Sequence, residues 1–265
     1  MGNELLGLPV LWMGVLILGA TYLVTAAIYL VVTRLATGER GRAFKAISPG
    51  VLPPLSLLFG LLIGFLAAQV WNDADRAGAA VNREASALRS AVLLAGAFPG
   101  ETESSLRELV RRHIEEAVSQ EWPAMARRTA TLTLVPPRLA DALRLAFALD
   151  PKGAGQLTAQ RDLIVSLQGA LEARRQRVIL SRSSLNWVKW TALLVEAGLT
   201  LLTIAMVHSD NRATNRIILT IFATGIGVAI VMIASHARPF TGDVSVTPSV
   251  LLQVMPEAGP VPPRP

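Results

Sequence analysis

Glu196 is the one ionisable residue in the long apolar stretch of residues 190–207, and it lies near the middle. The sequence of this stretch is WTALLVEAGLTLLTIAMV. An ionisable side chain at the centre of a bilayer costs at least ~2.5 kcal/mol on insertion scales, so it normally faces a cavity or a polar partner. Lys189, Thr200 and Thr203 share its helix face and extend it into a polar seam. The seam fits an ion or proton path that uses Glu196. It fits equally a protonated Glu196 that is hydrogen-bonded to a neighbouring helix, and the sequence leaves both interpretations open.

A second pattern consists of small residues in an earlier apolar stretch, residues 51–71. Small side chains spaced by four residues let two helix backbones approach closely in a membrane. The sequence does not say whether the partner helix belongs to the same chain. Gln69 follows at the polar end of this stretch, and we group it with Glu196, Thr200 and Thr203 as candidate pore-lining residues. The predicted packing residues are Ser56, Gly60, Gly64 and Ala68.

Motifs for enzymatic chemistry are absent from the sequence. The chain has no cysteine, and its three histidines, His113, His208 and His236, are too far apart to form a metal-binding motif. We find no phosphate-binding loop, no dinucleotide fingerprint and no hydrolase nucleophile motif. We therefore expect no catalytic residues, no metal and no cofactor, and an enzyme is not predicted.

Hydrophobic residues make up 52% of the chain, and four blocks of them are long enough to cross a bilayer. Polar sequence with helical periodicity separates the second block from the third. The sequence thus predicts an all-α membrane protein with four transmembrane helices and an extramembrane helical bundle inserted between spans two and three. The predicted spans are residues 8–33, 51–71, 186–207 and 216–235, with a helical domain over 72–185 and a Pro-rich tail over 236–265.

The connections between these parts carry further expectations. No proline lies between the apolar part of span two and Arg89, so we expect one helix from Val51 to about Arg89. The last helix of the inserted domain is expected to start at Gln156 or Thr158 and to continue into span three. Glycine and proline predict a loop without helix over Thr33–Gly50.

Two local predictions concern the inserted domain and the tail. Glu84 belongs to a charged segment just beyond span two, where solvated ion pairs on a helix surface are the favoured interpretation and a charged vestibule is the alternative. Alternation of valines with polar residues predicts a short strand within Thr241–Thr247. Ala258–Pro265 is expected to be disordered.

The formal net charge of +6 is compatible with two kinds of polyanionic surface, nucleic acid and anionic lipid. The basic residues are scattered over helices and the flanks of the apolar blocks, so we expect the lipid bilayer and not nucleic acid as the partner. The short loops place both termini and the helical domain outside the cell, whereas the arginines just before span three favour the cytoplasm. The side of the membrane that holds the helical domain stays open.

Three segments together resemble one known family. They are AQVWNDADRAGAAVNREASALRSAVLLA after span two, EEAVSQEWPAMAR in the inserted domain, and RPFTGDVSVTPSVL after span four. With the four-span plan, they resemble the bestrophin-like domain family of bacterial membrane proteins. The resemblance implies a relation to bestrophins, which are pentameric anion channels with four spans per subunit, and hence an integral protein of the bacterial inner membrane.

These observations lead to two hypotheses. The first is a homo-oligomeric ion channel that conducts small inorganic ions passively through a pore lined by span two and span three. The second is a non-conducting membrane scaffold or sensor whose helical domain binds a partner, with the four spans serving as an anchor. A stable oligomer with ion flux distinguishes the first from the second.

Overall fold

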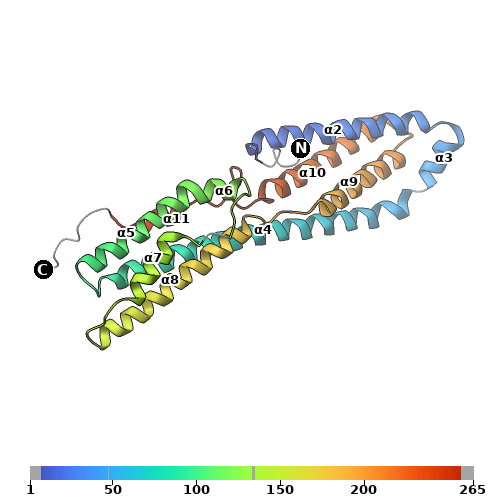
Figure 1. Cartoon of the computed structure of the whole chain (residues 1–265). Helices are drawn as coiled ribbons and strands as arrows, with labels where there is room; N and C mark the ends of the chain where they lie inside the picture. The colour runs from blue at the N-terminus through green and yellow to red at the C-terminus, as the bar shows by residue number, and fades with distance from the viewer. Residues whose placement is uncertain (1–6, 47, 133–134, 258–265) are drawn as a thin grey trace. The chain divides into compact units, whose positions relative to one another are not determined.

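The computed structural model describes residues 7–46, 48–132 and 135–257, and in this part of the chain all regular secondary structure is helical (Figure 1). The predicted all-α class is confirmed. Two compact units make up the chain. The membrane unit contains Met1–Asn72, Ser184–Arg238 and Gly242–Val244, and the helical unit contains Asp73–Ser183, Pro239–Thr241 and Ser245–Pro265.

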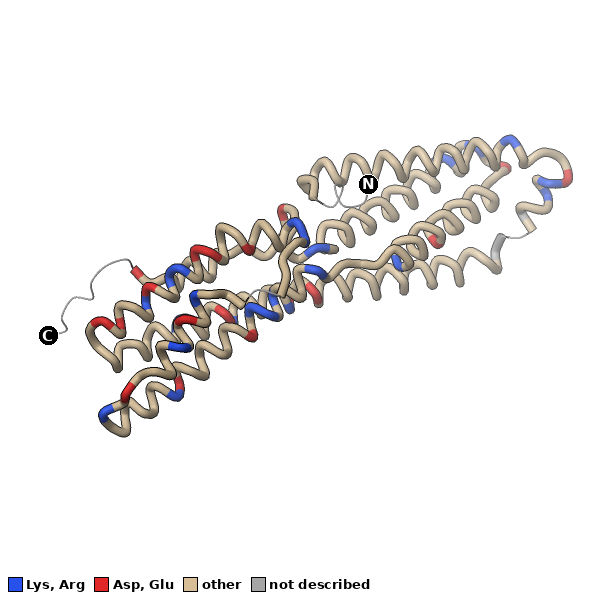
Figure 2. Tube along the Cα trace, in the orientation of Figure 1, with Lys and Arg blue, Asp and Glu red and all other residues tan. Residues whose placement is uncertain are grey.

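The membrane unit holds the four helices that are long and apolar enough to cross a bilayer. Even the shortest of them has 21 residues, which span about 30 Å at roughly 1.5 Å per residue. Few charged residues interrupt these helices (Figure 2). They are α2 (Val10–Leu35), the first half of α4 (Ser48–Ala95), α9 (Trp187–Val207) and α10 (Arg212–His236).

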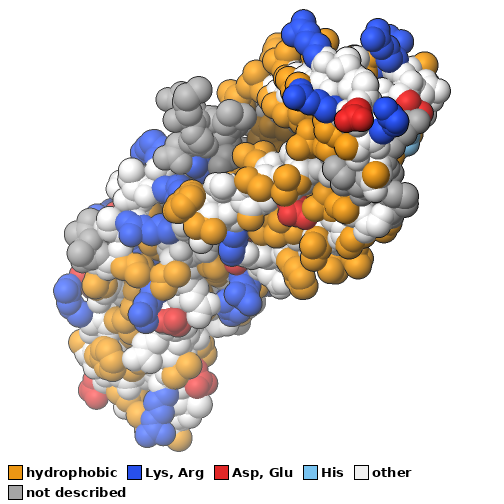
Figure 3. Space-filling model, turned by 90° about the vertical axis from the view of Figure 1, so that its right-hand side faces the viewer, with side chains coloured by type: hydrophobic (Ala, Val, Ile, Leu, Met, Phe, Trp, Pro, Cys, Tyr) orange, Lys and Arg blue, Asp and Glu red, His pale blue; other side chains and the backbone are white. Residues whose placement is uncertain are grey.

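Large apolar side chains of the membrane unit point both inward and outward. Inward, Leu193 and Ile204 of α9 are fully buried beside Ala223 of α10. Outward, Leu23 and Phe65 are more than 70% exposed, and Figure 3 shows hydrophobic side chains on the face of this unit turned toward the viewer. A water-soluble domain would bury such residues, so the outward faces fit contact with lipid.

The helical unit packs its helices around a separate core. Leu106, Val110 and Ile114 recur every four residues on α5 and are all buried, which is the expected behaviour of an amphipathic helix. They meet Leu88 of α4 and Leu167 of α8 in one apolar cluster. The helices of this unit are the second half of α4, α5 (Glu101–Glu116), the π-helix η1 (Ala117–Glu121), α6 (Trp122–Ala126), α7 (Pro137–Phe147), α8 (Ala154–Leu180) and α11 (Ser249–Gln253).

The predicted continuous helix through span two is confirmed, since α4 runs for 48 residues to Ala95. The predicted loop before it is wrong. A short helix, α3 (Gly38–Ala46), occupies half of it, and α4 already begins at Ser48. Gly38 has a φ of +57°, a conformation that glycine adopts without strain, and it makes the turn between α2 and α3.

The predicted passage from the last domain helix into span three is also wrong. α8 starts at Ala154 and ends at Leu180, and residues 181–186 are not helical. Asn186 then caps a new helix, because its side chain accepts a hydrogen bond from the backbone N–H of Lys189 at 3.0 Å. This capping residue starts a separate helix at Trp187, although the sequence on both sides of the break has helical periodicity.

The expected strand within Thr241–Thr247 does not form either. The backbone N–H of Val246 donates to the carbonyl oxygen of Pro239 at 2.7 Å, so the segment folds back on itself and pairs with no other strand in the described part of the chain. The expected disorder of Ala258–Pro265 concerns residues outside the described ranges.

Candidate functional site

Five charged or polar side chains meet in the interior of the helical unit, and we call them the charge cluster: Glu84, His113, Glu121, Arg174 and Arg177. Arg177 lies at the centre and is fully buried, as is Glu84. Its Nε and Nη2 donate to the two carboxylate oxygens of Glu84 at 2.7 and 3.0 Å, and Nη2 also donates to Glu121 at 2.9 Å. A bidentate arginine–carboxylate pair of this kind is among the strongest polar contacts in proteins.

Four helical segments supply these side chains, and two of them, α5 and the π-helix, are adjacent in sequence. Glu84 comes from α4, beyond its apolar part, and His113 comes from α5. Arg174 and Arg177 are three residues apart on α8 and therefore share a helix face. Glu121 is the last residue of the π-helix, and π turns occur mostly as single bulges inside α-helices, frequently at functional sites. The wider π turn changes the register before α6, and the Glu121 carboxylate reaches both arginines, with Arg174 Nε at 2.8 Å.

Trp122 covers the charge cluster on one side. Its ring lies 4.6 Å from the guanidinium carbon of Arg177, a cation–π contact. Phe240 meets the indole edge-on at 5.8 Å, and the indole Nε1–H donates to the carbonyl oxygen of Val246 at 3.1 Å. The tail segment after span four thus helps to shield the buried charges from water.

The surroundings determine the ionisation of both carboxylates. Burial by itself would raise the pKa of Glu84, but the charge of Arg177 and hydrogen bonds from His113 and Arg177 outweigh it and lower the pKa to about 2. Burial likewise opposes ionisation of Glu121, and its contacts with Arg174 and Arg177 still lower its pKa. Two carboxylates and two guanidinium groups therefore carry full and balanced charges.

Stability should depend on pH through Glu84. A folded-state pKa of about 2 against an ordinary 4.5 stabilises the fold above about pH 4.5, and this stabilisation is lost as the pH falls toward 2. We expect a loss on the order of 3 kcal/mol over this interval, from about 2.5 pKa units at about 1.4 kcal/mol each. Denaturant unfolding at several pH values would measure it. In Glu84→Gln the same interval should show a shallower slope, and an unchanged slope would contradict the assignment.

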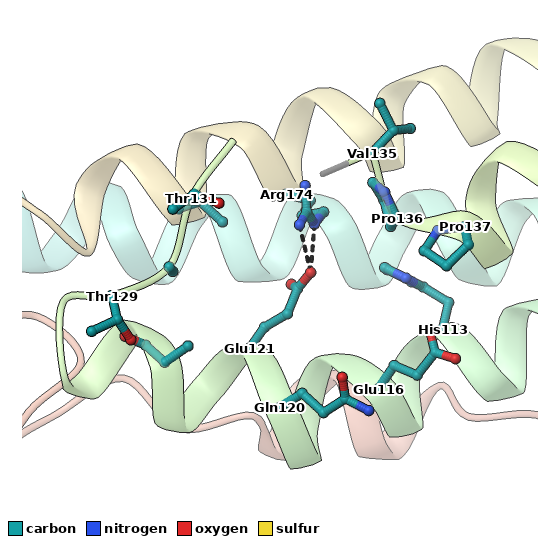
Figure 4. Close-up of a pocket in the computed structure, with 13 residues that line it drawn as sticks. His113, Glu116, Gln120, Glu121, Thr129, Thr131, Val135, Pro136, Pro137 and Arg174 are labelled. Carbon is teal, nitrogen blue, oxygen red and sulfur yellow. Dashed lines mark hydrogen bonds and ion pairs between the residues drawn. The ribbon is translucent and has the colours of Figure 1, made fainter. Parts of the chain in front are cut away.

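A pocket of about 570 Å³ opens beside the charge cluster, within the helical unit (Figure 4). His113, Glu121 and Arg174 contribute to its wall, so the pocket reaches buried charges. Figure 4 shows Arg174 and Glu121 joined across the pocket wall, with His113 beside them. The remaining lining residues are Glu116, Gln120, Ala124, Thr129, Ala130, Thr131, Val135, Pro136, Pro137 and Val178.

The predicted polar seam lies in the membrane unit, and its hydroxyl groups bond to their own helix. Thr200 is fully buried and donates to the carbonyl oxygen of Glu196 at 2.9 Å, and Thr203 donates to that of Leu199 at 2.8 Å. Glu196 is half-buried, and its Oε1 is buried without a hydrogen-bond partner among the described residues. Gln69 accepts a hydrogen bond from Lys189 Nζ at 2.5 Å, so the structure joins these two but does not pair Glu196.

The four predicted packing residues of α4, which we call the α4 ridge, lie mainly on the surface of the membrane unit. Gly60, Gly64 and Ala68 are exposed, and Ser56 is half-buried. A Cβ atom added at Gly60 or Gly64 would meet no atom of the described residues within 4 Å. No helix among the described residues therefore packs closely against Gly60 or Gly64.

The charge cluster is the part that sequence reasoning missed. The interpretation of Glu84 as one of several solvated charges is wrong, because the residue is buried and paired. A signal was present in the sequence: Glu84 is three residues after Val81 and four before Leu88, and both belong to the apolar stripe of α4. A single charge inside an apolar stripe indicates a buried partner.

Comparisons with known proteins agree with this fold. The family model described as Bestrophin-like domain matches residues 9–251. A crystal structure of a membrane protein superposes with a TM-score of 0.69 at 12% sequence identity, covering 90% of this chain and 96% of that chain, which shows a shared fold. The comparison with curated proteins gave no match. The chain is a membrane protein, and it belongs to the bestrophin-like domain family.

Proposed function

We propose that the protein is a homo-oligomeric channel that conducts small inorganic ions passively across the bacterial inner membrane. The observation that carries the proposal is Glu196, a carboxylate within the third span whose Oε1 is buried without a partner in the described part of the chain. A carboxylate at this depth is costly unless it faces water, an ion or a partner outside the described residues. A water-filled path alongside α9 would satisfy this requirement.

The exposed ridge of α4 supports an assembly of several copies. One chain contributes four spans, which are too few to surround a sizeable central pore. Gly60 and Gly64 leave room for a helix to approach α4, and a second copy of the chain supplies apolar helices of matching length. Assembly through this ridge would bring α4 and Gln69 of each copy toward the conduction path.

Flux measurement in liposomes is the direct test. We expect passive K⁺ or halide flux above that of empty liposomes, and a change in the K⁺/halide ratio in Glu196→Gln. An ionised carboxylate ring favours cations, so its removal should shift the ratio toward halide by roughly fivefold, which corresponds to about 1 kcal/mol for unit charges about 4 Å apart in water. Glu101→Gln, on the helical unit, serves as the matched control and should leave the ratio unchanged.

Two results would contradict the proposal. The first is absence of flux of either ion from protein that is folded and correctly inserted. The second is a monomeric mass in mild detergent for a preparation that does conduct, because conduction would then not need the α4 ridge. If Glu196→Gln leaves the flux unchanged, the protein is still a channel, but Glu196 does not lie on its conduction path.

The second candidate function is a non-conducting scaffold or sensor. The pocket of about 570 Å³ in the helical unit favours it, because a cavity that reaches buried charges can hold a ligand or a partner side chain. A folded, inserted protein without flux would favour this function over the channel.

A further inference from the structure

Only one of the two ring nitrogens of His113 forms a hydrogen bond with another residue of the charge cluster. The side chain is 2% exposed, and its Nε2 lies 3.1 Å from Oε1 of Glu84. Because Glu84 is ionised, its oxygen accepts this bond and Nε2 donates it. No described residue forms a hydrogen bond with the other ring nitrogen, Nδ1. His113 lines the pocket of about 570 Å³, and Figure 4 shows its ring beside Glu121 and Pro136.

Charge balance limits what the pocket can hold. Glu84 and Glu121 are matched by Arg174 and Arg177. Glu116, the other acidic residue of the wall, is paired with Arg138 Nε at 2.8 Å. A net-charged ligand would lose hydration without gaining an unpaired counter-charge, which is unfavourable. The pocket therefore fits an uncharged ligand.

The apolar residues of the pocket wall indicate which shape of ligand fits. Ala124, Val135, Pro136 and Val178 supply apolar surface, and the two adjacent prolines at the start of α7, Pro136 and Pro137, lack backbone N–H groups. Such a wall suits an apolar ring. The polar group of the ligand has to satisfy Nδ1, which accepts a hydrogen bond in neutral imidazole and donates one in imidazolium. A hydroxyl group both donates and accepts, so it fits Nδ1 in either state.

We propose that this pocket binds a small, uncharged molecule that carries a hydroxyl group on an apolar ring, with the hydroxyl on Nδ1 of His113 and the ring against Ala124, Val135 and Pro136. Phenol is the simplest member of this class. Binding here is a property of the helical unit and does not depend on ion conduction.

The test uses the full-length protein in detergent with ¹⁵N-labelled histidine and phenol as the probe. The chain has three histidines, so the spectrum reports His113 together with two internal controls, His208 and His236. We expect phenol to shift the His113 Nδ1 signal saturably, with a dissociation constant on the order of 1 mM for a ligand of about seven heavy atoms. The other two histidines should not respond. Substituting each of His208 and His236 by glutamine assigns all three signals without altering the charge cluster.

Matched ligands and one variant complete the test. Anisole, in which a methyl group replaces the hydroxyl hydrogen, and benzoate, which is charged, should each bind roughly tenfold more weakly than phenol. Ala124→Leu fills the pocket and leaves every charged residue of its wall in the sequence, so it should abolish the phenol response while the His113 signal stays at its native position. An unmoved His113 signal at high phenol concentration would overturn the proposal, and so would an equal response in Ala124→Leu or equal shifts of all three histidines.

Discussion

Replacing Glu84 by leucine is expected to lower the free energy of unfolding by about 3–5 kcal/mol, the usual cost of removing one partner of a buried ion pair. Arg177 would keep its hydrogen bond to Glu121 but lose the bidentate contact to Glu84, and its own side chain has no exposed surface. The Nε2 of His113 would lose its acceptor as well. Denaturant unfolding followed by circular dichroism in detergent would measure the difference.

Two variants show whether the loss comes from the unpaired charge. In the double variant Glu84→Leu/Arg177→Leu both charges are removed, and we expect it to be more stable than Glu84→Leu alone, because apolar replacement of a whole buried pair is often tolerated. Arg112→Leu removes an arginine whose side chain is 53% exposed and should change stability by no more than about 0.5 kcal/mol. If Glu84→Leu is no more costly than Arg112→Leu, the charge cluster does not stabilise the helical unit.

Replacing Trp122 by alanine should have an effect of similar size, about 3–5 kcal/mol, as for other buried aromatic side chains. The change removes the cation–π contact with Arg177, the edge-on contact with Phe240 and the hydrogen bond to Val246 together. Beyond the loss of stability, we expect the tail around Phe240 to become accessible to protease, because Trp122 packs against Phe240 within the helical unit. Unfolding curves and limited proteolysis would measure the two effects.

Two further substitutions separate the contributions at Trp122. Trp122→Phe keeps an aromatic ring and loses the hydrogen bond to Val246, so it should cost about 1 kcal/mol for the bond plus a smaller packing loss. Trp187→Ala makes the same change as Trp122→Ala at a site that is 76% exposed, and the fold should tolerate it. Equal losses in Trp122→Ala and Trp187→Ala would contradict the role of Trp122 as a cover of the charge cluster.

Hydropathy determined the class of this protein from the sequence. Four apolar blocks were enough to predict four spans, because crossing a bilayer depends on the length and composition of each segment alone. The continuity of α4 from its apolar part to about Arg89 was equally local, since no proline interrupts the helix there. The Glu-Trp-Pro and Arg-Pro-Phe segments pointed to the family.

The break at 181–186 and the helix at 38–46 were decided by single capping and turn residues, which periodicity does not report. Burial of Glu84 was decided at longer range. A carboxylate enters a protein interior only when partners neutralise it, and the partners of Glu84 come from α5 and α8, 29 and 93 residues away. The sequence by itself determined the four apolar segments that suit the membrane. Only the tertiary structure decided which charges meet and that His113 lines a pocket, because those depend on contacts between segments that no local pattern encodes.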